Sequence, residues 1–120
     1  MKITLHEESD IQVIRAEGKI AAGSGEQLLS EAVQAALDRG RLRIVIDFSR
    51  VTTMDSSGLG ELVAGFTGVC KARGQLCLSG LNSRIYRLLR MTNLHSVMTV
   101  QDTEAEAVIR LREGEAAGPR

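Results

Sequence analysis

The chain has 120 residues, of which 43% are hydrophobic and 25% charged, as is usual for a globular domain. Its 15 basic and 15 acidic side chains give a formal net charge of zero, and only Phe48, Phe66 and Tyr86 are aromatic. This balance excludes a basic footprint for nucleic acid and disfavours base stacking. The sequence shows neither a signal peptide nor an apolar run of the ~18 residues that span a membrane. We therefore expect a cytoplasmic protein.

The cysteine pattern gives no sign of a metal centre or of disulfide bonding. Cys70 and Cys77 form no Cys-x-x-Cys motif, and no histidine clusters with them. Two reduced cysteines in the core of a cytosolic protein are the simplest interpretation. We expect neither a metal nor a cofactor.

The first elements in chain order are two strands and a helix. Alternating polarity predicts strands at 2–6 and 11–16, joined as a hairpin by the polar residues 7–10. A stripe of apolar residues at helical spacing predicts a helix at 24–39. The stripe consists of Leu28, Leu29, Ala32, Val33, Ala36 and Leu37. Ser24 and Gln27 match a capping box at its start.

The remaining elements alternate between strand and helix. Residues 42–48 are mostly apolar and β-branched, which indicates a central strand covered on both faces. The pattern then predicts a helix at 57–71, a strand at 75–79, a helix at 83–91, a strand at 97–101 and a helix at 103–112. This order predicts an α/β fold in which a mixed, largely parallel sheet packs against about four helices. We expect one domain over residues 1–113 and a flexible tail at 114–120.

The helix predicted at 57–71 has an unusual face of small residues. Leu59, Leu62, Val63, Phe66, Val69 and Cys70 cluster on the side expected to face the core, whereas Gly60, Ala64 and Gly68 fall opposite them. A glycine in an exposed helix interior costs about 1 kcal/mol relative to alanine. We therefore interpret this face as a docking surface for a partner; the alternative is that these glycines are simply tolerated.

The loop Asp55-Ser56-Ser57-Gly58 follows the central strand, where open α/β sheets tend to carry functional sites. One interpretation makes Ser56 or Ser57 the helix cap, with Asp55 adding favourable charge. A catalytic serine would need a base, and neither histidine lies in a recognisable triad pattern. In a third interpretation a serine is phosphorylated, which adds about two negative charges beside Asp55 and disfavours a docked partner.

The segment from Asp47 to Gly60, Asp-Phe-Ser-Arg-Val-Thr-Thr-Met-Asp-Ser-Ser-Gly-Leu-Gly, resembles the signature of the STAS domain. More narrowly, it resembles the bacterial anti-sigma factor antagonists. The resemblance covers nearly the whole chain and includes residues 17–20, 74–76 and 84–94.

The resemblance implies a partner-switching mechanism. In the family, the unphosphorylated antagonist binds an anti-sigma factor that is also a serine kinase, and a sigma factor is freed. Phosphorylation of the motif serine separates the complex, and a PP2C-type phosphatase restores the hydroxyl. Carried over, the modified serine is Ser57, while Asp55, Ser56 and Gly58 support the loop. The protein would be a switch and not an enzyme.

Two further features bear on partner choice. Many antagonists of the family carry an aspartate where this chain has Ala21, a position near the phosphorylation loop. Arg84, Arg87 and Arg90 recur along one side of a helix, as a solvated face or as a basic contact for an acidic partner.

Two other functions remain open at this stage. The first is a constitutive STAS accessory subunit of a larger complex, such as a lipid-transport ATPase, which Ala21 favours slightly. The second is an enzyme such as a nucleotide hydrolase, which the lack of a Walker-type loop and of a catalytic base disfavours.

Overall fold

The computed structural model describes residues 1–21 and 28–114. The elements in chain order are β1 (Lys2–Glu8), β2 (Ile11–Ile20), α1 (Leu28–Asp38), β3 (Arg43–Met54), α2 (Ser56–Lys71), β4 (Gln75–Ser79), α3 (Ser83–Met91), the 3-10 turn η1 (Leu94–Ser96), β5 (Thr99–Gln101) and α4 (Glu104–Arg112). The predicted order of strands and helices is confirmed. The capping box of Ser24 and Gln27 and the tail beyond Gly114 lie outside the described residues.

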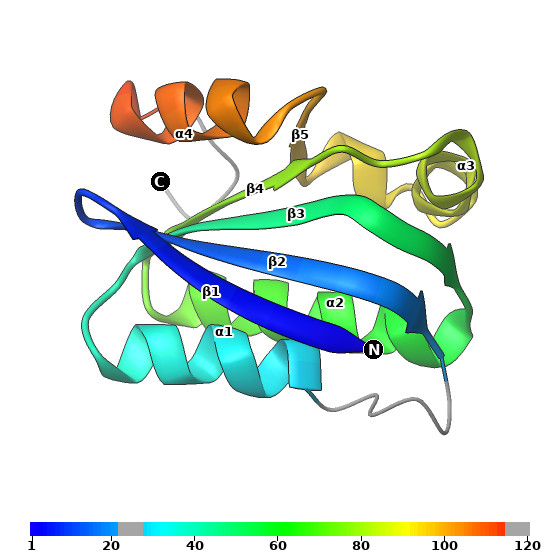
Figure 1. The fold of residues 1–120 in the computed structure, drawn as a ribbon, viewed down its shortest axis with the longest axis horizontal. Coiled ribbons are helices and arrows are strands. Elements are labelled where there is room, and N and C mark those ends of the chain that lie inside the picture. The colour runs from blue at the N-terminus through cyan, green and yellow to red at the C-terminus, as the bar shows by residue number, and fades with distance from the viewer. Residues whose placement is uncertain (22–27, 115–120) are drawn as a thin grey trace.

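The strands form one mixed sheet in the order β1-β2-β3-β4-β5. β1 runs antiparallel to β2, whereas the pairs β2–β3, β3–β4 and β4–β5 are parallel. Helices α1 and α2 cover one face of this sheet, and α4 covers part of the other (Figure 1). The α/β fold with a largely parallel sheet is therefore confirmed.

The central strand β3 is buried on both faces, as its continuous apolar run predicts. Ile44, Ile46 and Phe48 belong to the larger core, which α1 and α2 complete. The intervening Val45 belongs to a second cluster on the opposite face, where α4 contributes Ala107, Val108 and Leu111. This alternation is the side-chain period of a strand, and it fixes the register of the whole sheet.

β2 and β3 both extend well beyond the predicted strands. β2 continues to Ile20 and β3 to Met54, still paired with each other through two register irregularities, one between Arg15 and Glu17 and one between Gly18 and Lys19. Polar residues such as Thr52 interrupt the apolar run, which is why the sequence pattern places the strand end too early. Beyond Asp47, β3 no longer pairs with β4, and its extension carries the chain directly into the loop before α2.

Candidate functional site

Hydrogen bonds of Asp55 anchor the loop before α2 to β2 and to the first turn of α2. The Asp55 backbone N–H donates to the Ile20 carbonyl at the end of β2, with an N–O distance of 3.2 Å. Its carboxylate Oδ1 accepts from the Gly58 N–H at 3.0 Å, which makes Asp55 the N-cap of α2. The interpretation that Ser56 or Ser57 caps the helix is therefore wrong. Aspartate is as strong an N-cap as serine, and α2 begins one residue earlier than predicted.

The two serines occupy the first two positions of α2, and both are exposed. Among the described residues, none forms a hydrogen bond with the Ser57 hydroxyl. The unpaired N–H groups and the dipole of a helix N-terminus favour negative charge nearby. The arrangement therefore presents a solvent-accessible hydroxyl at a helix end that tolerates an anion.

Gly58 is required by the close approach of α2 to the end of β2. A Cβ at this position would overlap the Ile20 carbonyl oxygen and would lie 2.7 Å from Met54 Cγ and 2.8 Å from Ile20 Cγ2. No side chain fits there unless α2 moves away from the sheet. The glycine therefore sets how closely the serines sit against the end of β2.

The small-residue face of α2 is only partly exposed to solvent. Gly60 and Ala64 are exposed, and a Cβ built on Gly60 meets no atom within 4 Å. Gly68 instead faces α1, because its Cβ would lie 3.4 Å from Gln34 Oε1 and 3.5 Å from Leu37 Cδ1. The prediction that Gly68 belongs to the solvent-facing surface is therefore wrong. A helical wheel shows which residues share a side but not where the neighbouring helix packs.

Two other residues of α2 have surroundings that the helical wheel does not predict, for the same reason. Val63, expected in the core, is 37% exposed beside Ala64. Gly65, which the sequence analysis passed over, is buried, and its Cβ would lie 3.2 Å from Val33 Cγ2 of α1. We name the exposed set Gly60, Val63 and Ala64 the α2 surface. It begins one helical turn beyond Ser57.

Ala21 lies next to the same loop. It directly follows Ile20, whose carbonyl holds Asp55, and its side chain is half-buried. The predicted proximity of residue 21 to the Asp55–Ser57 loop is consistent with this geometry. The methyl group offers that loop neither a charge nor a hydrogen bond.

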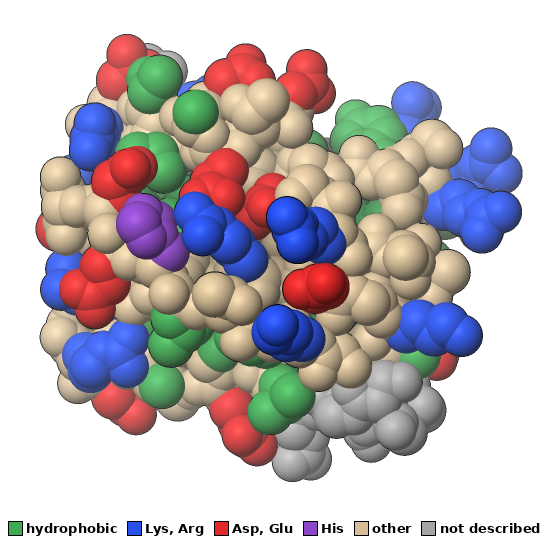
Figure 2. All heavy atoms as spheres, viewed as in Figure 1, with side chains coloured by type: hydrophobic (Ala, Val, Ile, Leu, Met, Phe, Trp, Pro, Cys, Tyr) green, Lys and Arg blue, Asp and Glu red, His purple; other side chains and the backbone are tan. Residues whose placement is uncertain are grey.

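Helix α3 is tied to the same extension of β3. Asn82 caps α3 by accepting from the Ile85 N–H at 2.9 Å, and its Nδ2 donates to the Val51 and Thr52 carbonyls at 3.3 and 3.2 Å. Arg84 and Arg87 are exposed on this helix. Basic side chains gather at the end of the molecule where α3 lies (Figure 2). A groove of ≈ 490 Å³ there is lined by Ser83, Tyr86, Arg87, Arg90 and Met91.

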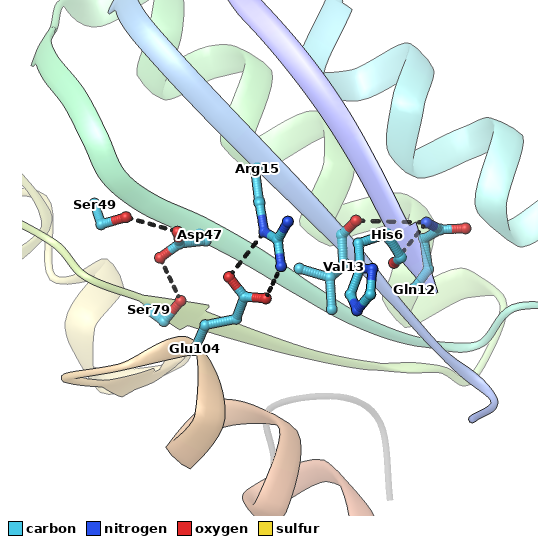
Figure 3. Close-up of polar contacts among 8 residues, drawn as sticks. All are labelled: His6, Gln12, Val13, Arg15, Asp47, Ser49, Ser79 and Glu104. Carbon is cyan, nitrogen blue, oxygen red and sulfur yellow. Dashed lines mark hydrogen bonds and ion pairs between the residues drawn. The ribbon is translucent and has the colours of Figure 1, made fainter. Parts of the chain in front are cut away.

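A polar cluster on the α4 side of the sheet lies where β3 and β4 separate (Figure 3). The nearly buried Asp47 accepts hydrogen bonds from Ser49 Oγ at 2.7 Å and Ser79 Oγ at 2.9 Å. Beside it, Arg15 donates to both carboxylate oxygens of Glu104 at 3.0 and 2.7 Å. This hydrogen bonding raises the pKa of the Arg15 guanidinium. Sequence reasoning missed the cluster, although an aspartate inside an apolar strand signals a buried partner.

The described residues hold neither a metal-ligand cluster nor a helix that could span a membrane. No group of three or more histidine, cysteine, aspartate or glutamate side chains within 1–21 and 28–114 is placed to hold a metal ion. Among the helices of that part of the chain, none has the length and apolar character needed to cross a membrane.

Comparison with known proteins identifies the family. The family model described as STAS domain matches residues 2–107, so the chain belongs to the STAS domain family. Within that family it groups with the anti-sigma factor antagonists. The anti-sigma-B factor antagonist of Bacillus subtilis is 38% identical over 93 residues, which cover 78% of this chain and 83% of the relative.

Solved structures show the same fold. An anti-sigma factor antagonist from Mycobacterium paratuberculosis superposes with a TM-score of 0.82 at 22% identity, covering 92% of this chain and 93% of that one. The Bacillus cell fate determinant SpoIIAA in its phosphorylated form superposes with a TM-score of 0.73 at 24% identity, covering 92% and 100%. The fold predicted from the sequence is thus confirmed by both comparisons.

Proposed function

We propose that this protein is a cytoplasmic anti-sigma factor antagonist switched by phosphorylation of Ser57. Its unphosphorylated form binds an anti-sigma factor that is also a serine kinase, and this binding frees a sigma factor. Phosphorylation of Ser57 by that kinase releases the complex, and a PP2C-type phosphatase resets the protein. The chain acts as a binding module and as the substrate of these enzymes.

One observation carries the proposal. Asp55 caps α2, so Ser57 is not needed for that task, and its exposed hydroxyl is available to a kinase. A serine whose side chain capped the helix would have to leave a backbone N–H of the first helical turn without a partner before it could be modified. Here the modification leaves the cap in place, so the fold persists in both states of the switch.

The charge of the phosphate explains how binding would be lost. A phosphoserine carries about two negative charges at neutral pH, and it would lie two residues after the Asp55 carboxylate. The α2 N-terminus accommodates this charge as long as water solvates it. A partner docked on the adjacent α2 surface would have to bury the phosphate and Asp55 together, which is costly without matching cations.

The contact surface we propose combines two elements. Gly60, Val63 and Ala64 provide a smooth, partly apolar surface one turn from Ser57. Arg84 and Arg87 provide a basic flank on α3. Hydrogen bonds from Asn82 hold the start of α3 against the end of β3 that leads into the Ser57 loop. Such a flank would speed encounter with an acidic partner surface and would make the association rate sensitive to salt.

Binding of the anti-sigma kinase from the source organism tests this proposal. We expect the wild type and Ser57→Ala to bind with ADP present, and only the wild type to be phosphorylated and released with ATP. Ser56→Ala is the matched control, because it removes a neighbouring exposed hydroxyl and should leave release intact. Phosphorylation of Ser57→Ala, or equal binding by Ser57-phosphorylated protein, would contradict the assignment.

A constitutive accessory subunit is the second candidate, and the observation that favours it is Ala21. This residue stands beside Asp55 where many antagonists carry an acidic residue, so the loop lacks that charge. Under this alternative the α2 surface still binds a partner, but Ser57 is never modified. Ala21→Asp separates the two functions, because it should raise the rate of Ser57 phosphorylation only if a kinase reads this loop.

A further inference from the structure

We propose that the exposed edge of β1 is a self-association surface, on which a second copy of this chain pairs its own β1 in antiparallel orientation. The two sheets would then join into one continuous sheet twice as wide. The proposal is independent of the Ser57 switch, because it concerns the strand at the edge of the sheet and not the loop before α2.

Within residues 1–21 and 28–114, β1 has an unpaired outer edge. β1 is the first strand in the sheet order, paired only with β2, and within the described residues no other strand covers its outer edge. Six of its seven residues are exposed, and Leu5 at its centre is 51% exposed. The outward N–H and C=O groups of such a strand form a template for another strand. In Figure 1, β1 is the strand in front, with β2 behind it.

The sequence of β1 is complementary to itself in one register. If two copies pair antiparallel with Leu5 opposite Leu5, then Lys2 stands opposite Glu8 of the second copy, and the reverse pair forms at the other end. In the same register Thr4 stands opposite His6 on both sides. Lys2 and Glu8 are exposed, and neither forms an ion pair with any residue of the described part of the chain.

The faces of the strand agree with this register. Lys2, Thr4, His6 and Glu8 share one face by the period of the strand, so both intermolecular ion pairs would form on the same side of the joined sheet. Leu5 lies on the opposite face, and the register stacks the two copies of this exposed apolar side chain against each other at the two-fold axis.

The remaining acidic residue of the edge does not compete for Lys2. Glu7 is already held by Arg41, with a distance of 2.6 Å between its Oε2 and Arg41 Nη2. It lies on the Leu5 face and points away from the face that carries Lys2. Glu8 is thus the acidic residue of β1 that is available to pair with Lys2 of the second copy.

Sedimentation equilibrium of the full chain over a range of concentrations tests the proposal. We expect a concentration-dependent dimer for the wild type, and a dissociation constant raised about tenfold or more by Lys2→Glu or Glu8→Lys, since each change sets like charges opposite one another at both ends. The double variant Lys2→Glu with Glu8→Lys restores opposite charges and should dimerise like the wild type. Leu5→Lys should be monomeric.

Asp102→Lys is the matched control for charge. It makes the same change of two units as Glu8→Lys but lies just after β5, at the far edge of the sheet, and should leave dimerisation unchanged. Thermal unfolding by circular dichroism confirms that each variant is folded before its mass is compared. A wild type that stays monomeric at every concentration overturns the proposal. So does a dimer that the single charge reversals leave intact or that the double variant fails to restore.

Discussion

Gly58→Ala should destabilise the protein, although alanine is the better helix former. The added Cβ would overlap the Ile20 carbonyl oxygen and would lie under 3 Å from Met54 Cγ and Ile20 Cγ2. Overpacking of this kind costs about 1–3 kcal/mol, and a shift of α2 away from β2 also weakens the Asp55 N–H to Ile20 bond, worth about 1 kcal/mol. The gain in helix propensity offsets about 1 kcal/mol. We expect a net loss of about 2 kcal/mol.

Gly60→Ala is the matched control for this prediction, because the same substitution two residues later meets no atom within 4 Å. It should raise the free energy of unfolding by up to about 1 kcal/mol. Urea denaturation followed by circular dichroism measures both values. If Gly58→Ala were as stable as Gly60→Ala, the close approach of α2 to β2 would not be what requires the glycine.

Four other changes test separate parts of the structure. Asp55→Ala should lower the free energy of unfolding by about 1 kcal/mol, since the Gly58 N–H loses its cap. Leu62→Ala in the fully buried core should lower it by about 2–5 kcal/mol in the same denaturation assay. Glu104→Gln should cost under about 1 kcal/mol, because Arg15 and Glu104 keep 43% and 26% of their side-chain surfaces exposed. Burial raises the pKa of the Cys77 thiol from 9.0 to about 11, so its contribution to stability is full below pH 9.0 and is lost as pH rises through about 11. In Cys77→Ala, the urea concentration at the unfolding midpoint should fall less between pH 9.0 and about 11 than it does in the wild type. An equal fall in both proteins would contradict the assignment of this pH dependence to Cys77.

The order of elements could be predicted because strand alternation and helical stripes are strong over most of the chain. Helix α3 begins and ends where the pattern predicts, since Asn82 and Ser83 mark its start and apolar positions such as Ile85 follow at helical spacing. The β3 extension could not be predicted in the same way. Its residues are polar on exposed faces, and only pairing with β2 keeps them in a strand.

The site was predicted in outline and corrected in detail. The Asp-Ser-Ser-Gly motif located the loop, but it could not decide which of three adjacent residues, Asp55, Ser56 or Ser57, is the N-cap of α2. That choice depends on where β3 ends and how Ile20 holds Asp55. Gly68 shows the same limit, because its surroundings are set by α1, which is distant in the sequence.

Phosphopeptide mapping, with intact mass, of the protein isolated from its own cells during growth and under stress tests the Ser57 switch most directly. We expect a single phosphate on Ser57 whose occupancy changes with the condition. A protein that carries no phosphate in any condition, or one modified on Ser56 with Ser57 intact, would contradict the assignment of Ser57 as the switch.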